Sequence, residues 1–559
     1  MIATSAMIAA AAAAATPLIV WGKTRLDLSR AKHPSLAGHA RWGKRIASLL
    51  PFYEYDEAAM FRCDDPPEAI ARRRAAGFAR LAAHFAARYA KGRKLVAQGL
   101  AGLSDLQFIE AYRVPFQFRD QVGAKLGGGI FYQSSDGVML TDVDGNRFYD
   151  LAGSYGVNLL GYDIYKSCID EGCDTARALG PVLGVYHPVV LRNVERLKRV
   201  SGKQEVSFHM SGTEAVMQAV RLARYHSGKR RIVRFCGAYH GWWGDVQPGV
   251  GNPVPARDTL TLADMSDRTL KVLGRRRDIA CVLVNPLQAL HPNGAAPADS
   301  GLVDSSRRAG ADRGAYAEWL RRLRELCSLR GIVLIFDEVF VGFRLAPGGA
   351  QEYFGVEADL VTYGKTVAGG LPVGVLCGPH ALMKRFRDDR PVDVNVARGT
   401  FHSHPYVMGA MDAFLTRFES PEVRRLYDGL DARWDGRARD LNRRLEARGH
   451  PLRVANLSSI WTILYTRPSR YNWMLQYYLR SEGLALPWVG TGRFIFSLNY
   501  GDEDFAAVAD RFCAAADAMA ADGWWWEGHG LTDKAIRRRI FGEMLRSRLG
   551  SRPHPRSLL

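Results

Sequence analysis

Two hydrophobic patterns alternate along the middle of the chain, between about residues 185 and 415. Short continuous runs of Val, Ile, Leu and Phe are separated by longer stretches in which apolar residues recur every three or four positions. Continuous runs are typical of strands buried on both faces of a parallel sheet, and the 3.6-residue period is typical of the helices that cover it. We therefore predict an α/β fold around a mostly parallel sheet. The predicted strands are Glu205–His209, Arg231–Phe235, Ala280–Asn285, Gly331–Phe336, Leu360–Tyr363 and Val373–Gly378, and the helices include Glu214–Ser227 and Tyr316–Leu329.

The segments on either side have a different pattern. From Pro67 to Tyr89, apolar residues recur near the helical period between arginines, which predicts an amphipathic helix. Such a helix either packs on the main body or lies on an anionic membrane surface. Short strands joined by a turn at Asp144–Asn146 are expected before about residue 150. After about residue 415, alternating helices and strands predict a smaller α+β unit.

Charge is unevenly distributed over the 559 residues, which carry 76 Lys and Arg against 57 Asp and Glu. The first 21 residues contain no charged side chain, and the next 24 contain seven Lys or Arg against Asp27 alone. About 20 uncharged residues can cross a bilayer as a helix, and basic residues that follow would keep the remaining chain on the cytoplasmic face. We predict an N-terminal membrane anchor on this basis; a frayed, Ala-rich N-terminus is the alternative. The basic tail from Leu531 is predicted to be a solvated helix and frayed end, which could also contact anionic lipid or an acidic partner.

Composition excludes several classes of protein. With 47% hydrophobic and 24% charged residues, most of the chain can bury a core, so it is not wholly disordered. Its eight cysteines are too few for a disulfide scaffold, and the absence of any Cys-x-x-Cys pair argues against a structural zinc site. We predict no metal. No basic segment interleaved with aromatics matches a nucleic-acid-binding module, so nucleic acid is not expected as a partner.

Four segments place reactive or polar residues at the ends of predicted strands, where ligands bind in open α/β sheets. Met210–Ala215 follows a strand and opens a helix, which suits a phosphate, although the same residues occur in simple capping boxes. Asp337 closes a very apolar strand and needs a cationic partner there. Lys365, 28 residues later, closes another, where desolvation lowers the pKa of an amine and makes it nucleophilic. With the fourth segment, Arg398–Pro405, they provide the amine, acid and phosphate cradle that pyridoxal phosphate requires.

With these segments in this order, residues 120 to 520 resemble the class III, fold type I, pyridoxal phosphate-dependent aminotransferases. Within that family the chain is similar to glutamate-1-semialdehyde aminomutases and to aminotransferase domains of assembly lines. The motifs that carry the resemblance are residues 208–215, 237–241, 285–288, 336–344, 363–365 and 399–401. The resemblance implies a large domain with a mostly parallel sheet and a smaller α+β C-terminal domain, here preceded by a helical N-terminal extension. The predicted divisions are 1–22 (anchor), 23–120 (basic helical region), 121–185 (N-terminal arm), 186–410 (large cofactor-binding domain), 411–525 (small domain) and 526–559 (basic tail).

The resemblance also implies residue roles. Lys365 would hold the cofactor as a Schiff base and transfer protons, and Asp337 would pair with the pyridinium nitrogen. The other implied contacts are Ser211, Gly212 and Thr213 at the phosphate, Tyr239 and Val339 on the two ring faces, Gln288 at the phenolic oxygen, and Thr400 at the phosphate of the partner subunit in an obligate homodimer. Tyr155 and Asn158 are candidates for the substrate pocket, and His240 is either a structural partner of the Tyr239 loop or a catalytic group. Asn285 and His404 depart from the Glu and Asn that the family most often has before Pro286 and Pro405.

The predicted function is transfer of an amino group from an amino donor to a carbonyl acceptor. A 1,2-aminomutase, a decarboxylase and a racemase remain open, because all of them use Lys365 and Asp337. A scaffold or nucleic-acid binder with an inactive enzyme core is disfavoured by the intact pair. The uncharged N-terminus and basic flanks favour an amphiphilic acceptor, such as an acyl chain on an acidic carrier protein; a small soluble keto acid or aldehyde is the alternative.

Overall fold

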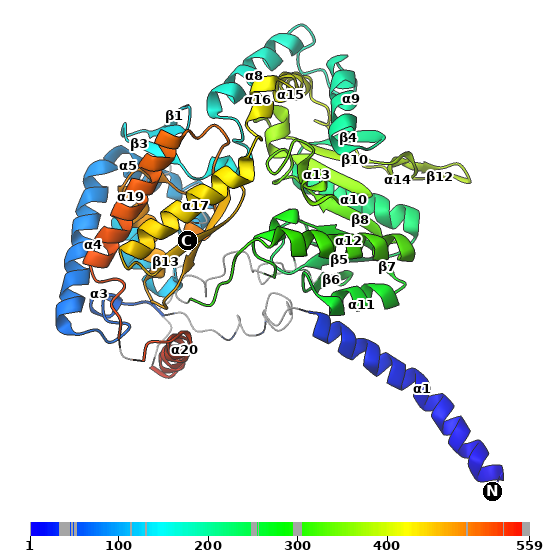
Figure 1. Cartoon of the computed structure of the whole chain (residues 1–559), viewed down its shortest axis with the longest axis horizontal. Helices are drawn as coiled ribbons and strands as arrows, with labels where there is room; N and C mark the ends of the chain where they lie inside the picture. Colours follow the sequence, from blue (N-terminus) through cyan, green and yellow to red (C-terminus); the bar gives the residue numbers. More distant parts are fainter. Residues whose placement is uncertain are drawn as a thin grey trace.

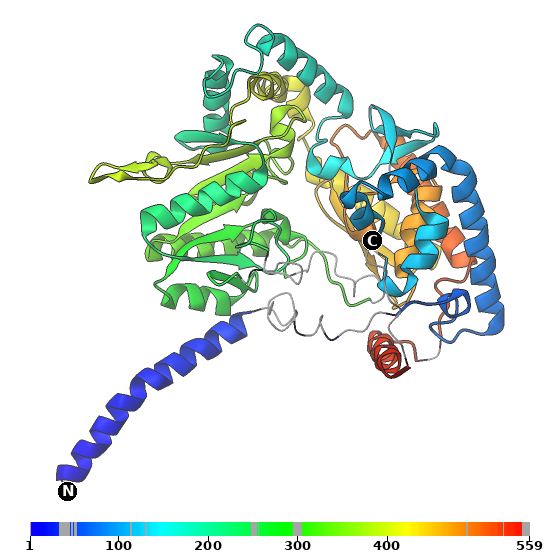
Figure 2. The same ribbon diagram turned by 180° about the vertical axis from the view of Figure 1, so that it is seen from behind.

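Two packed units and a projecting N-terminal helix make up the protein (Figure 1). The computed structural model describes residues 2–32, 53–111, 114–128, 131–247, 256–293, 305–487, 490–528 and 530–550, with residues 45, 49 and 254 in isolation. The larger unit holds the main sheet, and the smaller unit combines the C-terminal elements with helices from residues 57 to 126 (Figure 2). Helices α8 (Tyr162–Ala176) and α15 (Pro405–Phe418) pack against each other beside the main sheet.

A seven-stranded sheet forms the centre of the larger unit, in the order β4-β10-β9-β8-β7-β5-β6. All its neighbouring strands are parallel except β10, which runs antiparallel to both β4 and β9. The six predicted strands are confirmed, with shifts of one or two residues at some ends. The prediction missed β6, a four-residue edge strand of alternating Thr and Leu. The strands are β4 (Glu205–His209), β5 (Arg231–Phe235), β6 (Thr259–Leu262), β7 (Ile279–Val284), β8 (Val333–Asp337), β9 (Leu360–Gly364) and β10 (Gly374–Gly378).

Alternate residues of these strands serve opposite faces of the sheet. Leu283 and Ile335 pack with the apolar side of α10 (Gly212–Ser227), whereas Val282 and Leu334 join the core that includes α12 (Arg313–Arg330). Since both faces are covered, every residue of β7, β8 and β9 is buried, which explains their continuous apolar sequences. The other elements of this unit are α9 (Val189–Ser201), α11 (Asp267–Arg275), α13 (Gly349–Phe354), α14 (His380–Met383), β11 (Phe386–Arg387) and β12 (Arg390–Val394).

The smaller unit is built on a three-stranded antiparallel sheet, β13-β14-β16. The buried rings of Trp434, Trp461, Phe496 and Phe505 contact one another beside it. A second sheet, β1-β2-β3-β15, joins the arm to this unit, because β15 pairs in parallel with β3. The elements are β1 (Tyr132–Asp136), β2 (Met139–Asp142), β3 (Arg147–Asp150), α16 (Pro421–Arg425), α17 (Leu430–Ala447), β13 (Leu452–Leu457), β14 (Ile460–Tyr465), α18 (Leu475–Ser481), β15 (Leu484–Ala485), β16 (Phe494–Ile495) and α19 (Asp502–Ala521).

The amphipathic helix predicted after Pro67 is α4 (Glu68–Arg88), and its apolar side packs on the main body. Phe78, Leu81 and Phe85 are buried, and the Phe85 ring lies 6.1 Å from that of Tyr477 in α18. This burial supports the first of the two readings of this helix, because the apolar side is not available to a membrane surface. The remaining N-terminal helices are α3 (Glu57–Met60), α5 (Ala90–Leu100), α6 (Ser104–Ala111) and α7 (Arg119–Leu126).

Helix α1 (Ile2–Ala31) covers the segment predicted as a membrane anchor. Within the described part of the chain no helix has the length and hydropathy needed to span a membrane, so the prediction of a spanning anchor is not supported. The helix continues past the uncharged segment through Lys23, Arg25 and Asp27. Its C-terminal end docks on the larger unit: Asp27 pairs with Arg275 of α11, and the carbonyl of Ala31 accepts a hydrogen bond from the Ala263 N–H at 2.8 Å.

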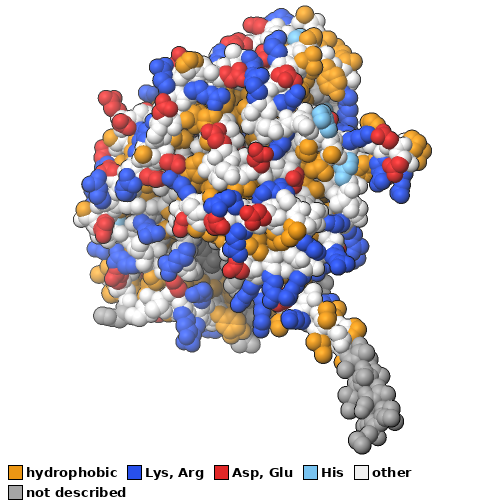
Figure 3. Space-filling view, turned by 45° about the vertical axis from the view of Figure 1, so that its right-hand side comes forward, with side chains coloured by type: hydrophobic (Ala, Val, Ile, Leu, Met, Phe, Trp, Pro, Cys, Tyr) orange, Lys and Arg blue, Asp and Glu red, His pale blue; other side chains and the backbone are white. Residues whose placement is uncertain are grey.

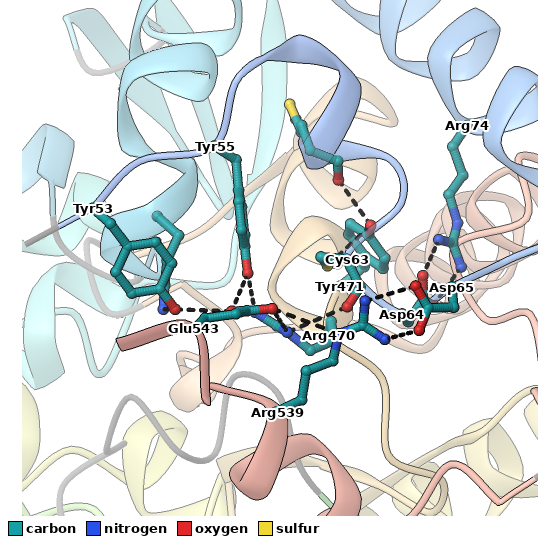
Figure 4. Close-up of polar contacts among 12 residues, drawn as sticks. Tyr53, Tyr55, Cys63, Asp64, Asp65, Arg74, Arg470, Tyr471, Arg539 and Glu543 are labelled. Carbon is teal, nitrogen blue, oxygen red and sulfur yellow. Dashed lines mark hydrogen bonds and ion pairs between the residues drawn. The ribbon is translucent and has the colours of Figure 1, made fainter. Parts of the chain in front are cut away.

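The basic tail forms helix α20 (Asp533–Gly550), and a partly buried acid, Glu543, holds it against the smaller unit. Glu543 accepts hydrogen bonds from the hydroxyls of Tyr53 at 2.8 Å and Tyr55 at 2.6 Å, and its two carboxylate oxygens lie 3.0 and 3.1 Å from the Arg470 guanidinium (Figure 4). The helix was therefore predicted correctly, but it is docked rather than fully solvated. Elsewhere on the surface, acidic and basic side chains are interspersed over the face seen in Figure 3.

Candidate active site

Lys365 and Asp337 lie at the carboxyl ends of neighbouring strands. Asp337 is the last residue of β8 and pairs in register with Thr362, and Lys365 directly follows β9 with a positive φ of 52°. Burial lowers the pKa of the Lys365 amine; the Asp337 carboxylate opposes this shift, and the Arg493 guanidinium adds to it. A lowered pKa increases the fraction of neutral, nucleophilic amine at a given pH.

Asp337 and Glu338 are adjacent in sequence, but their side chains lie on opposite faces of the sheet and have different partners. Because side chains alternate along a strand, Asp337 shares the α10 side of the sheet with Ile335, and Glu338 points the other way. The Glu338 carboxyl accepts hydrogen bonds from the backbone N–H groups of Ala350 and Gln351 at the start of α13, and burial raises its pKa to about 8. Asp337 is thus the acid available to a ligand.

His240 holds the Asp337 carboxylate. Its Nδ1 lies 2.8 Å from Asp337 Oδ2 and must carry the proton, since a carboxylate only accepts. Burial lowers the pKa of His240 although Asp337 opposes this, which favours the neutral ring with its proton on Nδ1. The Val339 N–H and the Thr362 hydroxyl donate to the other oxygen at 3.2 and 3.4 Å. The sequence left the role of His240 open; the structure places it against Asp337.

The turn at Ser211–Thr213 has the geometry of an anion cradle. Ser211 caps α10 by accepting from the Glu214 N–H at 3.3 Å, and Glu214 Oε2 accepts from the Met210 N–H at 3.0 Å. A Cβ on Gly212 would lie 2.5 Å from Val339 Cγ1, and one on Gly241 would lie 2.5 Å from Thr213 Oγ1. Glycine therefore lets the neighbouring chain segments approach at the start of the helix, where backbone N–H groups can bind a phosphate.

Three other predicted cofactor contacts differ in burial. The Tyr239 side chain is 58% exposed, which leaves its ring available for stacking, and Asn285 Nδ2 donates to its carbonyl at 3.1 Å. Gln288 is buried and donates to the Cys236 carbonyl at 2.7 Å. Thr400 is exposed in the loop after β12.

The two substrate-pocket candidates are placed differently. Tyr155 is 43% exposed in a turn at Gly153–Gly156, and a Cβ on Gly156 would lie 2.7 Å from the Phe340 ring and 3.5 Å from Lys365 Cδ. This turn therefore lies against the Lys365 side chain. Asn158 is buried, and its Oδ1 accepts from the Gly161 N–H at 2.9 Å just before α8.

A second cation beside Lys365 was missed in the sequence. The Arg493 guanidinium carbon lies 5.5 Å from the centre of the Phe340 ring, and Lys365 Nζ lies 5.8 Å from the same centre. Arg493 is half-buried, and the desolvation of its guanidinium lowers its pKa to about 10. Among the described residues no carboxylate pairs with it. The sequence feature that could have indicated this cation is the position of Arg493 directly before the apolar run at residues 494–496.

These features fit pyridoxal phosphate: an amine with a lowered pKa, an acid whose orientation is fixed, an exposed aromatic ring and a glycine-lined helix start. The sequence model of the family described as class-III aminotransferases matches residues 123–248 and 269–515. The chain belongs to the class III aminotransferase family. It is accordingly a pyridoxal phosphate-dependent enzyme of fold type I, and the predicted fold class, cofactor and enzyme class are confirmed.

Relatives of this class III enzyme include both aminomutases and transaminases. Glutamate-1-semialdehyde 2,1-aminomutase of Nitratidesulfovibrio vulgaris is 33% identical over 413 residues, which cover 68% of this chain and 90% of that protein. Among solved structures, a transaminase with PLP bound is 26% identical with a TM-score of 0.59, covering 71% of this chain and 92% of that one. An omega-transaminase from Sphaerobacter thermophilus is 25% identical with a TM-score of 0.58, covering 70% and 91%. A glutamate-1-semialdehyde aminomutase from Pseudomonas aeruginosa, 18% identical with a TM-score of 0.64, covers 81% and 99% and shows the fold alone.

Proposed function

We propose that this enzyme is an aminotransferase whose amino donor carries a carboxylate. The observation that carries the proposal is Arg493, a guanidinium without a carboxylate partner among the described residues that shares the Phe340 ring with Lys365. A desolvated cation is costly unless an anion meets it. A bidentate bond to a substrate carboxylate would supply that anion and would hold the amino carbon near Lys365.

The chain's own side chains divide the work of the reaction. Pyridoxal phosphate, when bound, supplies an electron sink for the carbon that loses a proton. Lys365 Nζ would hold the cofactor until the donor displaces it, and the freed amine would accept the proton of the donor carbon and return it at the cofactor. Asp337, fixed by His240, would keep the ring nitrogen protonated so that the sink retains its strength. Ser211, Gly212 and Thr213 would bind the phosphate.

The second candidate is a 1,2-aminomutase, favoured by relatives of that name such as the Nitratidesulfovibrio protein. The half-reaction with an amino donor alone distinguishes the aminotransferase from the aminomutase. The holoenzyme in its aldehyde form is mixed with a panel of amino acids, without acceptor, and both absorbance and released keto acid are followed. An aminotransferase should convert to the amine form and release one keto acid per site. If no amino acid produces keto acid, but an amino aldehyde is isomerised without net release of a keto acid, the aminomutase is correct.

The carboxylate part of the proposal has its own test. Arg493→Gln should lower kcat/KM for amino-acid donors by about 10- to 150-fold, which corresponds to loss of a charged hydrogen bond of about 1.5–3 kcal/mol. A primary amine without a carboxylate is the matched control substrate, and its rate should change little. Equal losses with both donors would show that Arg493 does not bind the carboxylate.

We also infer a homodimer and an amphiphilic acceptor. The exposed position of Thr400 supports its contact with the partner subunit. Exposed Leu18, Ile19 and Trp21, followed by Lys23 and Arg25, support a site near lipid or acyl chains. Deletion of residues 2–22, followed by assays of short- and long-chain acceptors with and without anionic vesicles, tests the acceptor. Equal turnover of both lengths under all conditions would refute it.

A further inference from the structure

Among the described residues, one group of three metal-ligating side chains comes together outside the reacting groups. It consists of His209, Glu214 and His402, and one ligand atom from each lies within 4.8 Å of the other two. His209 ends β4, Glu214 lies in the first turn of α10, and His402 lies in the loop before α15. Three separate elements therefore meet at this point, and no local spacing in the sequence shows it.

The geometry of the group is close to that of a tetrahedral metal site. His402 Nε2 lies 3.1 Å from Glu214 Oε2, and the rings of His209 and His402 are 4.8 Å apart between centres at an angle of 74°. Two ligands of a tetrahedral zinc ion bound at 2.0–2.1 Å are about 3.3 Å apart. One pair of ligand atoms, His402 Nε2 and Glu214 Oε2, is already at about this spacing, and the other pairs, within 4.8 Å, would have to move closer to bind an ion.

The burial of the three side chains also suits a metal site. His209 and His402 are buried, at 4% and 9% exposed, whereas the Glu214 side chain is 43% exposed. The two imidazoles are held by the fold, and the carboxylate side gives access to solvent for an incoming ion and a water ligand. The nearby Arg385 donates to Ser207, whose hydroxyl contacts His209 Nε2 at 3.1 Å.

We propose that His209, Glu214 and His402 form a zinc site that fastens the phosphate-binding turn to the loop carrying Thr400. His209 and Glu214 flank the turn at residues 210–213 directly in sequence, and His402 follows Thr400 by two residues. Two imidazoles and one carboxylate are a donor set that zinc uses, with water in the fourth position. The ion would place positive charge beside the turn that receives the cofactor's phosphate.

Metal content of the tag-free holoenzyme tests the proposal. After dialysis against EDTA and then ZnCl₂, the wild-type protein should retain one zinc per chain by mass spectrometry, and its melting temperature should rise with zinc concentration. His402→Gln keeps a hydrogen-bond donor for Glu214 but removes a ligand. Its zinc affinity should fall by more than about 100-fold, beyond the 10- to 100-fold typical of outer-shell changes.

Two further variants identify where the ion binds. Glu214→Gln should also lose the zinc, whereas His380→Gln, which removes an exposed histidine paired with Glu205, should retain it. Without zinc, the melting temperatures of the wild type and His402→Gln should agree. Failure of the wild type to retain zinc would overturn the proposal. Zinc that is retained equally by His402→Gln and Glu214→Gln would overturn it too, since the ion would then lie elsewhere.

Discussion

Glu543→Gln is the sharpest test of how the C-terminal helix is held. The substitution keeps the size of the side chain but removes the charge that faces Arg470, whose side chain is 1% exposed. Removing one partner of a buried ion pair costs about 3–5 kcal/mol, because the other charge is left uncompensated. Glu543 itself is 13% exposed, so the lower end, about 3 kcal/mol, is the appropriate value. This corresponds to a rise of about 150-fold in the population with α20 undocked.

Asp65→Asn is the matched control on the same helix. Asp65 pairs with Arg539 of α20, but these side chains are 79% and 33% exposed, so their pair is worth at most about 1 kcal/mol. Undocking should then rise by no more than about fivefold. The comparison isolates burial, because both substitutions change an acid to its amide at contacts of one helix.

Hydrogen exchange in the native state is the suitable assay, since a chain of this size with several units does not unfold in two states. Peptides from residues 533–547 and 53–64 should exchange faster in Glu543→Gln and stay near the wild type in Asp65→Asn. Equal exchange in the two variants would refute the reasoning.

The pH dependence of docking follows from the same contacts. Burial alone would raise the pKa of Glu543, but the Arg470 guanidinium and the hydroxyls of Tyr55 and Tyr53 outweigh it and hold the pKa below its ordinary value. The unfolded state then binds more protons, so this stabilisation is present above about pH 4.3 and is lost as pH falls through the folded pKa. Exchange from α20 in the wild type should therefore accelerate below about pH 4, and Glu543→Gln should lack this acceleration.

Three predictions concern the active site. Gly212→Ala should weaken cofactor binding by more than about 10-fold, since its Cβ would lie 2.5 Å from Val339; equal affinity in a cofactor titration would contradict the cradle. His240→Phe should lower kcat by about 10- to 150-fold through loss of the hydrogen bond to Asp337, with a changed pH dependence of the cofactor's absorbance that a merely structural role would not produce. Asp337→Asn should move the pH profile for covalent attachment of the cofactor at Lys365 to lower pH, because the carboxylate raises the pKa of that amine; an unchanged profile would exclude the coupling.

Local pattern was sufficient for the main sheet and its covering helices. Strands β7, β8 and β9 are buried on both faces, so each is an uninterrupted apolar run in the sequence. The start of helix α10 is indicated by the capping residue Ser211. The edge strand β6 was not predicted, because an alternating pattern over only four residues is too short to indicate a strand. Lys365 and Asp337 could be predicted for a related reason: a charged residue that ends a buried strand is conspicuous.

Pairings between distant segments could not be predicted. Glu543 was counted only as one acid in a basic tail, although its partners Tyr53 and Arg470 come from segments 490 and 73 residues away. The docking of α1 could not be predicted for the same reason, because Asp27 meets Arg275 of α11, 248 residues away. The composition of a segment gives its own residues, whereas its docking depends on the partner residues that the fold places beside it.

The proposed function depends on two basic groups near the Phe340 ring, Lys365 and Arg493, that differ in how readily they lose a proton. Lys365 can lose its proton, and burial together with Arg493 outweighs the opposing effect of Asp337 on its pKa. Arg493 stays charged, because a pKa of about 10 still lies far above neutral pH. Under the proposed function, the same desolvation that favours the neutral, reactive form of the lysine amine would leave the arginine charged as an anchor for the donor carboxylate. If the two were exchanged, the nucleophile would be locked in its charged form and the anchor would titrate, so the order of Lys365 and Arg493 around Phe340 is what allows one apolar surface to serve both binding and proton transfer.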